Sequence, residues 1–391
     1  ILSFWGDSGQ SEGLVRKLLD SPIAMRGLRN SFLLAIALSI TTNIVGIFIV
    51  LMSEYFDIKG AKLLKIGYMT TFVYGGIILV SGYLMLYGQT GVVTRLLTNI
   101  FPEMNQQWFQ GFWPVLFVMT VATTTLHMMF LSNAVKSIDN FTIEAAKNMG
   151  AKPFYIIRRV VLPIVMPTIY AVTILQFLTG LGAFSAPLLI GGRDFQTIAP
   201  LVLQLNSIPG SRGLAIILSF ILGLATVILL TIFARLQKGG TYFSISKTKA
   251  DYVKQKIDHK VLNVVVHVLA YLLFAVYVLP VIVIVVFSFT NATAIFEVRF
   301  SLSDLTLQNY VNVFSNRDRI EPFFNSINFS ALASVGVVVV VLMGVHLHHK
   351  YDNLYTKFVE YSFLVPWMIP SLIIALGLLG AYDTPRLIMG N

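Results

Sequence analysis

The chain has 391 residues, of which 56% are hydrophobic and 12% charged, and its formal net charge is +10. Soluble domains carry about 25% charged residues, so this composition excludes an ordinary soluble protein and indicates a membrane protein. The chain contains no cysteine, which excludes disulfides and thiolate metal sites.

Eight runs free of Asp, Glu, Lys and Arg reach the length of about 20 apolar residues that a helix needs to cross a bilayer. The sequence therefore predicts an all-α, polytopic membrane helical bundle. The intervals between the runs are too short for a soluble domain of any size. The runs are 32–52, 66–87, 111–131, 160–182, 213–234, 261–289, 326–347 and 361–382.

The basic residues predict how the runs are oriented. If the spans alternate and the stretch 132–161 is cytoplasmic, the cytoplasmic stretches hold 17 of the 28 Lys and Arg residues. This bias follows the positive-inside rule. The lipid bilayer therefore explains the positive charge, and no nucleic-acid partner is expected.

A polar segment, 137–163, interrupts the apolar pattern. Ser137 or Asp139 can cap a short helix, Gly150 can end it in the left-handed conformation, and Pro153 suits the first turn of a second helix. The segment is therefore predicted to form an elbow of two helices around the glycine. From composition alone, an amphipathic helix lying at the membrane interface without a partner is the alternative.

The spacing within this elbow is distinctive: Glu144-Ala145-Ala146, three residues, Gly150, nine residues, Val160, one residue, and Leu162-Pro163. It resembles the EAA coupling loop of ABC-transporter permeases, in which Ile is more common at the position of Val160. The resemblance implies that the elbow inserts into a groove of an ATPase subunit and transmits its closure to the membrane helices. The residues expected to make this contact are Glu144, Ala145, Ala146, Gly150, Arg158, Arg159, Leu162 and Pro163.

At the level of the whole chain, the resemblance is to type I ABC importer permeases in which both membrane halves are fused. It implies a multi-pass protein of the bacterial plasma (inner) membrane. The implied partners are two ATP-binding-cassette ATPase subunits, which hold ATP and Mg, and an extracytoplasmic substrate-binding protein. The segments Pro366-Trp367-Met368-Ile369-Pro370 and Tyr382-Asp383-Thr384-Pro385 are most similar to ferric-iron permeases. Thiamine, phosphonate and polyamine importers share much of this layout.

Two absences agree with that interpretation. The chain has no G-x-x-x-x-G-K-[ST] phosphate loop, so we expect a transport subunit that is not an enzyme, binds no cofactor itself and has no catalytic residues. The eight runs lack the ionisable groups that ion-driven transporters usually need at mid-membrane. An ion-gradient-driven secondary transporter is the alternative from another class. No metal site is predicted, and His127 and His267 are expected to be hydrogen-bonded helix residues.

The span that leaves the elbow contains Pro163, Pro167 and Pro187, which are expected to kink or unwind it. Irregular backbone at membrane depth persists where it lines a cavity. Candidates for the transport pathway are therefore Gly182, Phe184, Ser185 and Pro187, with simple packing as the alternative.

A shift of 295 residues overlays the sequence on itself: Asn30-Ser31 falls on Asn325-Ser326, and Gly82 falls on Gly377. Because apolar runs meet apolar runs, we predict two parallel repeats, which in transporters commonly build a pathway at their interface. The first repeat is assigned to 1–236, without its opening helix, and a basic cytoplasmic linker to 237–260. The second repeat, 261–391, is expected to be incomplete, ending before its own coupling loop, so the chain is interpreted as part of a longer fused protein.

Overall fold

The computed structural model describes residues 14–74, 76–208, 210–239, 253–257, 259–297, 301–351 and 353–368, with a few positions between 374 and 382. All regular secondary structure in these residues is helical apart from two isolated β-bridges, which confirms the all-α class. The chain divides into two compact units, 1–283 and 284–391. Linker residues 240–252, and the motif positions Ile369, Pro370, Asp383, Thr384 and Pro385, lie outside the described residues.

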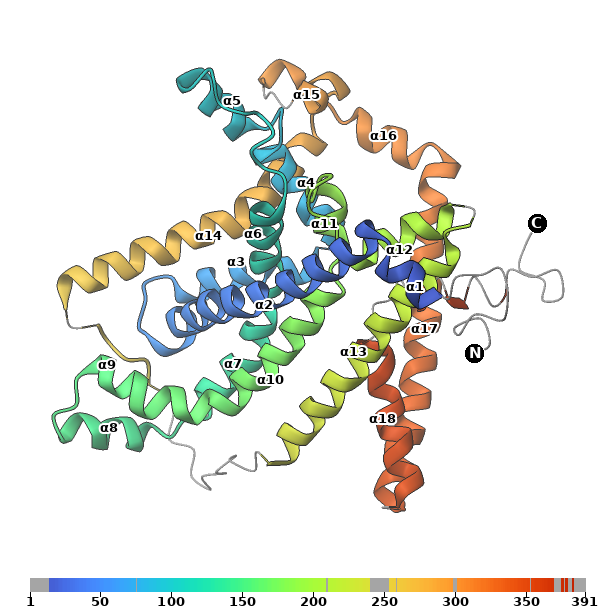
Figure 1. Ribbon diagram of the computed structural model, residues 1–391. Coiled ribbons are helices and arrows are strands. Elements are labelled where there is room, and N and C mark those ends of the chain that lie inside the picture. The colour runs from blue at the N-terminus through green and yellow to red at the C-terminus, as the bar shows by residue number, and fades with distance from the viewer. Residues whose placement is uncertain are drawn as a thin grey trace. The chain divides into compact units, whose positions relative to one another are not determined.

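The first unit is built around a long helix, α2 (Pro22–Val50), which packs most extensively against α10 (Leu162–Leu181) (Figure 1). It also packs against α6 (Phe112–Thr123) and α7 (Thr125–Lys136). The other helices of this unit are α1 (Leu14–Leu19), α3 (Ala61–Val73), α4 (Gly76–Tyr87), α5 (Val92–Ile100), α8 (Asn140–Asn148), α9 (Pro153–Ile156), α11 (Ser185–Ile190), α12 (Ile198–Ser207), α13 (Arg212–Gly239) and most of α14 (Lys260–Ser288). Two π-helical turns, η2 (Leu51–Tyr55) and η3 (Ile157–Val161), extend α2 at its end and precede α10.

Small residues explain how closely α2 and α10 approach each other. Ala35 of α2 faces Gly180 of α10, and a Cβ added at Gly180 would lie only 2.5 Å from the Ala35 Cα. Small residues let membrane helices pack backbone to backbone in this way. The crossing brings α10, which follows the elbow directly, against the central helix of the unit.

Six helices of the described chain are long and apolar enough to cross a membrane, and α6 with α7, bent by 42° at Thr124, can form a seventh span. These cover six of the eight predicted runs, and the run 361–382 lies largely outside the described residues. The prediction of one continuous helix over 66–87 is wrong. Tyr74 has an extended backbone (φ −97°, ψ 127°), so α3 ends there, and the apolar span of this region is Gly76–Ile100.

The helix α14 packs onto the first unit although it follows the linker. The hydroxyl of Tyr68 donates to the Ala270 carbonyl at 2.7 Å, and that of Tyr83 donates to the Val276 carbonyl at 3.0 Å. The Tyr68 ring also meets the Tyr277 ring edge to face, with centroids 5.2 Å apart. Packing thus places most of α14 with the first unit, whereas the 295-residue offset assigns it to the second repeat.

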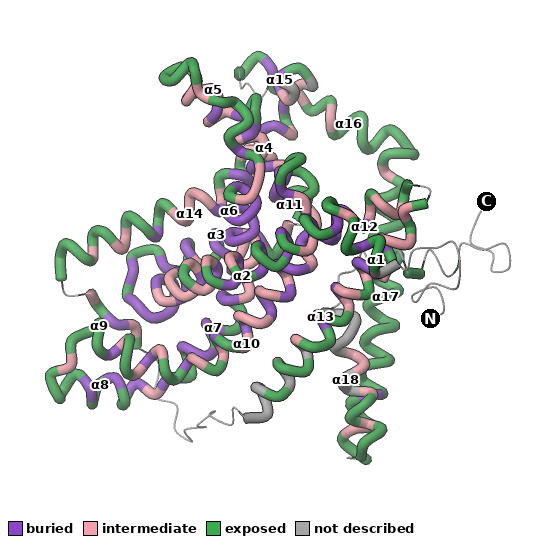
Figure 2. The backbone as a smooth tube through the Cα atoms, in the orientation of Figure 1, coloured by how far each residue is buried: buried purple, intermediate pink, exposed green. Residues whose placement is uncertain are grey.

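The second unit contains the end of α14 and then α15 (Ala292–Glu297), η4 (Leu302–Asp304), α16 (Gln308–Phe314), α17 (Arg317–Lys350) and α18 (Leu354–Met368). Gly344 is the buried residue of α17, which is otherwise largely exposed (Figure 2). The 295-residue offset maps the span Pro22–Tyr55 onto Arg317–Lys350 at both ends. These bounds support the two-repeat interpretation, and the division into repeats stays a prediction.

Candidate functional site

The segment 137–163 folds as an elbow. Asp139 caps α8, and its carboxylate accepts a hydrogen bond from the backbone N–H of Phe141 at 3.0 Å. Gly150 has a φ of +79°, a left-handed conformation that glycine adopts without a steric penalty. Pro153 is the first residue of α9. The predicted cap, turn and second helix are confirmed.

One face of the elbow is buried in its own chain and the other is open. Ile143, Ala146 and Ile156 are buried in the hydrophobic core. Four large side chains, each more than half exposed, are available on the elbow surface: Phe141, Met149, Phe154 and Tyr155. Large apolar side chains exposed within one short segment are typical of a protein-binding site.

The eight residues predicted to contact an ATPase lie in different environments. Leu162 is half-buried, and Ala146 packs into the core of its own chain. Ile143 and Ala146, three residues apart, share the buried face of α8. Ala146 therefore does not present its side chain on the elbow surface, and the ATPase contact of the set stays a prediction. The exposed members of the set are Glu144, Ala145, Gly150, Arg158, Arg159 and Pro163.

Both charged residues of α8 already form hydrogen bonds within the chain. Glu144 Oε1 accepts a hydrogen bond from Asn140 Nδ2 at 3.0 Å. Lys147 Nζ donates to Oε1 of Gln255, a residue of the linker. Arg158 and Arg159 are exposed in the π-turn η3, and Lys152 is exposed just before α9, so all three side chains contribute positive charge to the elbow surface.

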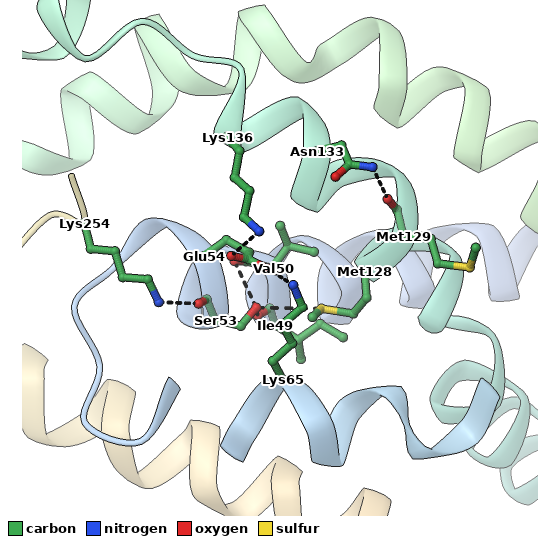
Figure 3. A network of polar contacts seen from close by, with 10 residues as sticks. All are labelled: Ile49, Val50, Ser53, Glu54, Lys65, Met128, Met129, Asn133, Lys136 and Lys254. Carbon is green, nitrogen blue, oxygen red and sulfur yellow. Dashed lines mark hydrogen bonds and ion pairs between the residues drawn. The ribbon is translucent and has the colours of Figure 1, made fainter. Parts of the chain in front are cut away.

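A buried carboxylate lies beside the root of the elbow, and sequence reasoning missed it. Glu54, 5% exposed, sits in the π-turn η2 at the end of α2. Its carboxylate pairs with Lys65 Nζ of α3 at 2.5 Å and with Lys136 Nζ at the end of α7 at 3.3 Å (Figure 3). Glu54 thus joins three helices where the elbow begins. A signal was present, since it is one of two acidic residues in the basic stretch 53–65.

The linker contributes a third lysine to this region. Lys254 Nζ donates to the Ser53 carbonyl at 2.6 Å (Figure 3). Carbonyls in the last turn of a helix lack intrahelical partners, and a lysine is well suited to supply one. Burial lowers the pKa of Lys254 from its ordinary value, while the charges of Glu54 and Asp57 act in the opposite direction.

The pathway candidates surround a break after α10. The helix α10 continues through Pro163 and Pro167, so no break occurs at these two prolines. It ends at Leu181 and α11 begins at Ser185, so the interruption predicted near Pro187 is confirmed. Pro187 is buried within α11, and Ser185 Oγ lies 3.0 Å from the position that a Cβ would take at Gly76 of α4. The segment thus packs against α4, and a pathway role for Gly182, Phe184, Ser185 and Pro187 stays a prediction.

A polar cluster lies inside the apolar bundle. Asn43 Nδ2 donates to Thr173 Oγ1 at 2.8 Å, and Asn43 Oδ1 lies 3.2 Å from His127 Nε2. Gln176 Nε2 donates to the Thr123 carbonyl at 2.7 Å. His127 is therefore a hydrogen-bonded helix residue, as predicted, and the cluster cross-links α2, α7 and α10.

Fold and site together define the class: a multi-pass helical membrane protein whose spans are joined by a surface elbow with an exposed apolar face. Residues 83–239, which include the whole elbow, match the family described as "Binding-protein-dependent transport system inner membrane component". Over this region the chain is similar to the inner-membrane permeases of ABC transporters.

Individual relatives agree with this family. The chain is 36% identical over 96% of its length to a probable ABC transporter permease protein, y4fN, of Sinorhizobium fredii. It is 25% identical over half its length to a putative ferric transport system permease protein, FbpB 1, of Haemophilus influenzae. It is 30% identical over 32% of its length to the spermidine/putrescine transport system permease protein PotC of Escherichia coli. The chain spans 66%, 30% and 48% of these relatives, less than two thirds of each.

Two solved structures are similar to this chain at low sequence identity. A chain from the crystal structure of a bacterial alginate ABC transporter in complex with alginate pentasaccharide-bound periplasmic protein has a TM-score of 0.48 and 18% identity. The match covers 60% of this chain and 84% of the other. A second structure, of a bacterial ABC transporter that imports the acidic polysaccharide alginate, has a TM-score of 0.48 and 17% identity.

Proposed function

We propose that this chain forms the membrane pathway of an ATP-driven importer and that the elbow 137–163 is its contact with an ATPase subunit. The observation that carries the proposal is the elbow itself. Its spacing is that of a coupling loop, Gly150 is left-handed, and Phe141, Met149 and Phe154 of the elbow are exposed. Apolar side chains of this size contribute much of the affinity of protein interfaces.

The partners follow from this role. Two ATPase subunits would bind ATP and Mg, and a substrate-binding protein outside the membrane would deliver the solute. The description of the family as binding-protein-dependent supports the second partner. The coupling contact is assigned to Glu144, Ala145, Gly150, Arg158, Arg159 and Pro163, with Leu162 at its edge and Ala146 as a core residue beneath it.

For the substrate we propose ferric iron, with a polyamine as the alternative. Similarity to the ferric transport permease of Haemophilus influenzae supports iron. Similarity to the spermidine/putrescine permease of Escherichia coli supports the alternative. Thiamine and phosphonate importers have a related layout. Because a delivering protein would select the solute, the permease sequence carries little of the specificity.

The test uses the full-length permease with its ATPase and binding protein in liposomes. We expect uptake of radiolabelled ferric iron that requires ATP on the ATPase side and persists when an ionophore collapses the proton and sodium gradients. Uptake of labelled spermidine instead would replace the proposed substrate and keep the class. Uptake that follows the ion gradient without ATP would show a secondary transporter and contradict the proposal.

A further inference from the structure

The described part of the linker, residues 253–257, is here called the linker strap. The backbone N–H of Gln255 donates to the Tyr55 carbonyl, and the backbone N–H of Asp57 donates to the Gln255 carbonyl, both at 2.9 Å. These two bonds form a parallel β-bridge between Gln255 and Phe56. The strap is thereby attached to the turn that ends α2, and this attachment does not depend on any side chain.

The side chain of Gln255 reaches from the strap to the elbow. It is 7% exposed, and its Oε1 accepts a hydrogen bond from Lys147 Nζ. Its Nε2 donates to the Val253 carbonyl at 2.8 Å and lies 3.5 Å from Asn140 Oδ1. Asn140 and Lys147 are seven residues apart, about two helical turns, and so lie on one face of α8. One buried amide therefore contacts both ends of this helix.

The neighbouring residues connect the same strap to the membrane helices. Lys254 caps the Ser53 carbonyl at the end of α2, and Glu54 of the same turn pairs with Lys136 just before the elbow. On the other side, α14 begins at Lys260, three residues after the strap ends at residue 257. The strap is thus a junction of α8, the end of α2 and the start of α14.

A helix as short as α8, with nine residues, is not stable by itself and depends on tertiary contacts. Its apolar anchoring within the chain rests on Ile143 and Ala146. Without polar contacts α8 would be held by these two side chains alone and could pivot about Gly150, because glycine has more backbone freedom than any other residue. The contacts of Gln255 with Asn140 and Lys147 restrain that rotation.

We propose that the linker strap, acting through Gln255, fixes the elbow to α2 and α14 so that these elements move as one body when the elbow is displaced. The inference rests on the proposed function for the source of the displacement, an ATPase subunit. Gln255 acts through Asn140 and Lys147 and is a positioning residue. The strap therefore transmits force from the elbow to one span before and one span after the linker.

The test measures the distance between α8 and the start of α14 in the full chain in nanodiscs. Because the chain has no cysteine, spin labels can be attached at T142C and V261C, both exposed positions. We expect one narrow distance distribution, unchanged when the ATPase subunits and ATP are added. Gln255→Ala should broaden it at least twofold and make it respond to ATP, with ATP hydrolysis by the complex changed less than threefold.

Matched variants distinguish the loss of the Gln255 contacts from a general disruption of the fold. Lys256→Ala, at the exposed neighbouring position, should leave the distribution narrow. Gln255→Glu keeps an acceptor for Lys147 and should also keep it narrow, which guards against a misfolded alanine variant. Lys147→Met should reproduce Gln255→Ala, and the double variant should be no broader than either, because both remove the same contact.

An unchanged distribution in Gln255→Ala, with the variant folded, would overturn the proposal. Failure of the ATPase subunits to bind the parent chain would instead overturn the proposed function. The two failures are distinguishable because the anchoring of the elbow is measured in the ATP-free chain, before any partner is added.

Discussion

Gly150 is the residue whose conformation matters most for the elbow. A Cβ added there would meet no heavy atom within 4 Å, and its φ is +79°. A larger residue would therefore strain the backbone by about 1–2 kcal/mol. Its side chain would also project into the space proposed for the ATPase subunit. We expect Gly150→Val to insert normally into the membrane and to bind the ATPase subunits at least about tenfold more weakly, the equivalent of 1.4 kcal/mol, as measured by titration in nanodiscs.

Gly150→Asn is the matched control, because asparagine tolerates the left-handed conformation better than other residues. It should retain more of the binding than Gly150→Val. Equal and undiminished binding by both variants would show that Gly150 is not at the contact.

Glu54 is expected to matter for stability. Removing one partner of a buried ion pair costs about 3–5 kcal/mol, but Lys65 and Lys136 have 33% and 47% of their side chains exposed. We therefore expect Glu54→Ala to lower the free energy of unfolding by about 2 kcal/mol, measured by denaturant titration in detergent. Asp57→Ala, at an exposed position, should change it by less than about 0.5 kcal/mol. Equal stability of the two variants would contradict a structural role for the cluster.

The residues that sequence reasoning placed correctly are those governed by local chemistry. Three features depend only on neighbours in the chain and could be predicted from the sequence: the cap at Asp139, the left-handed turn at Gly150 and the helix start at Pro153. The burial of Ala146 and the pairing of Glu54 depend on helices distant in the sequence. No spacing rule for a single segment contains that information.

At the scale of elements, the crossing of α2 and α10 can be tested at Gly180. A Cβ there would lie 2.5 Å from the Ala35 Cα, and the backbone cannot yield as a flexible side chain would. Overpacking of this kind typically costs 1–3 kcal/mol. We expect Gly180→Ala to reduce the free energy of unfolding by about 2 kcal/mol in the same titration.

The control is Gly223→Ala on α13, where a Cβ would meet nothing within 4 Å. Because alanine favours helix relative to glycine by about 1 kcal/mol, this variant should be as stable as the parent or more so. If Gly180→Ala were as stable as the parent protein, α2 and α10 could move apart without a loss of stability, which would contradict the importance of this close approach.

Hydropathy located most of the membrane-spanning helices but did not reveal two interruptions, one at Tyr74 and one at Thr124. The run 66–87 is uniformly apolar, so composition offers no reason to divide it. The break lies at Tyr74, directly before two glycines that favour helix poorly. The 42° bend between α6 and α7 at Thr124 was equally invisible, since the run 111–131 contains no charged residue at that point.

At the scale of the whole molecule, the predicted orientation in the membrane has a direct test. Gln89 lies after α4 and Lys152 lies on the elbow, and both are exposed. Single cysteines at the two positions should react with membrane-impermeant thiol reagents from opposite sides, because the positive-inside rule places the elbow in the cytoplasm. Labelling of both from the same side would contradict the predicted topology.

The sequence could predict the class of the molecule, because hydropathy is a property of the chain itself, whereas the division into repeats stays a prediction. It could not predict which helices pack together. The contacts of Tyr68 and Tyr83 with α14 join residues about 200 positions apart. Nothing local to either segment specifies such a pair.

The bond between Lys147 and Gln255 also has a consequence for the time course of synthesis. The two residues are 108 positions apart, and at 5–20 residues per second the ribosome needs roughly 5–20 s to make the intervening chain. During that interval α8 has already been synthesised and α10 to α13 are being made. Gln255, whose side-chain amide contacts α8, has not yet been synthesised. In the nascent chain the elbow therefore lacks its contacts with Gln255. An ATPase subunit that bound at this stage would meet a more mobile α8 than in the complete protein.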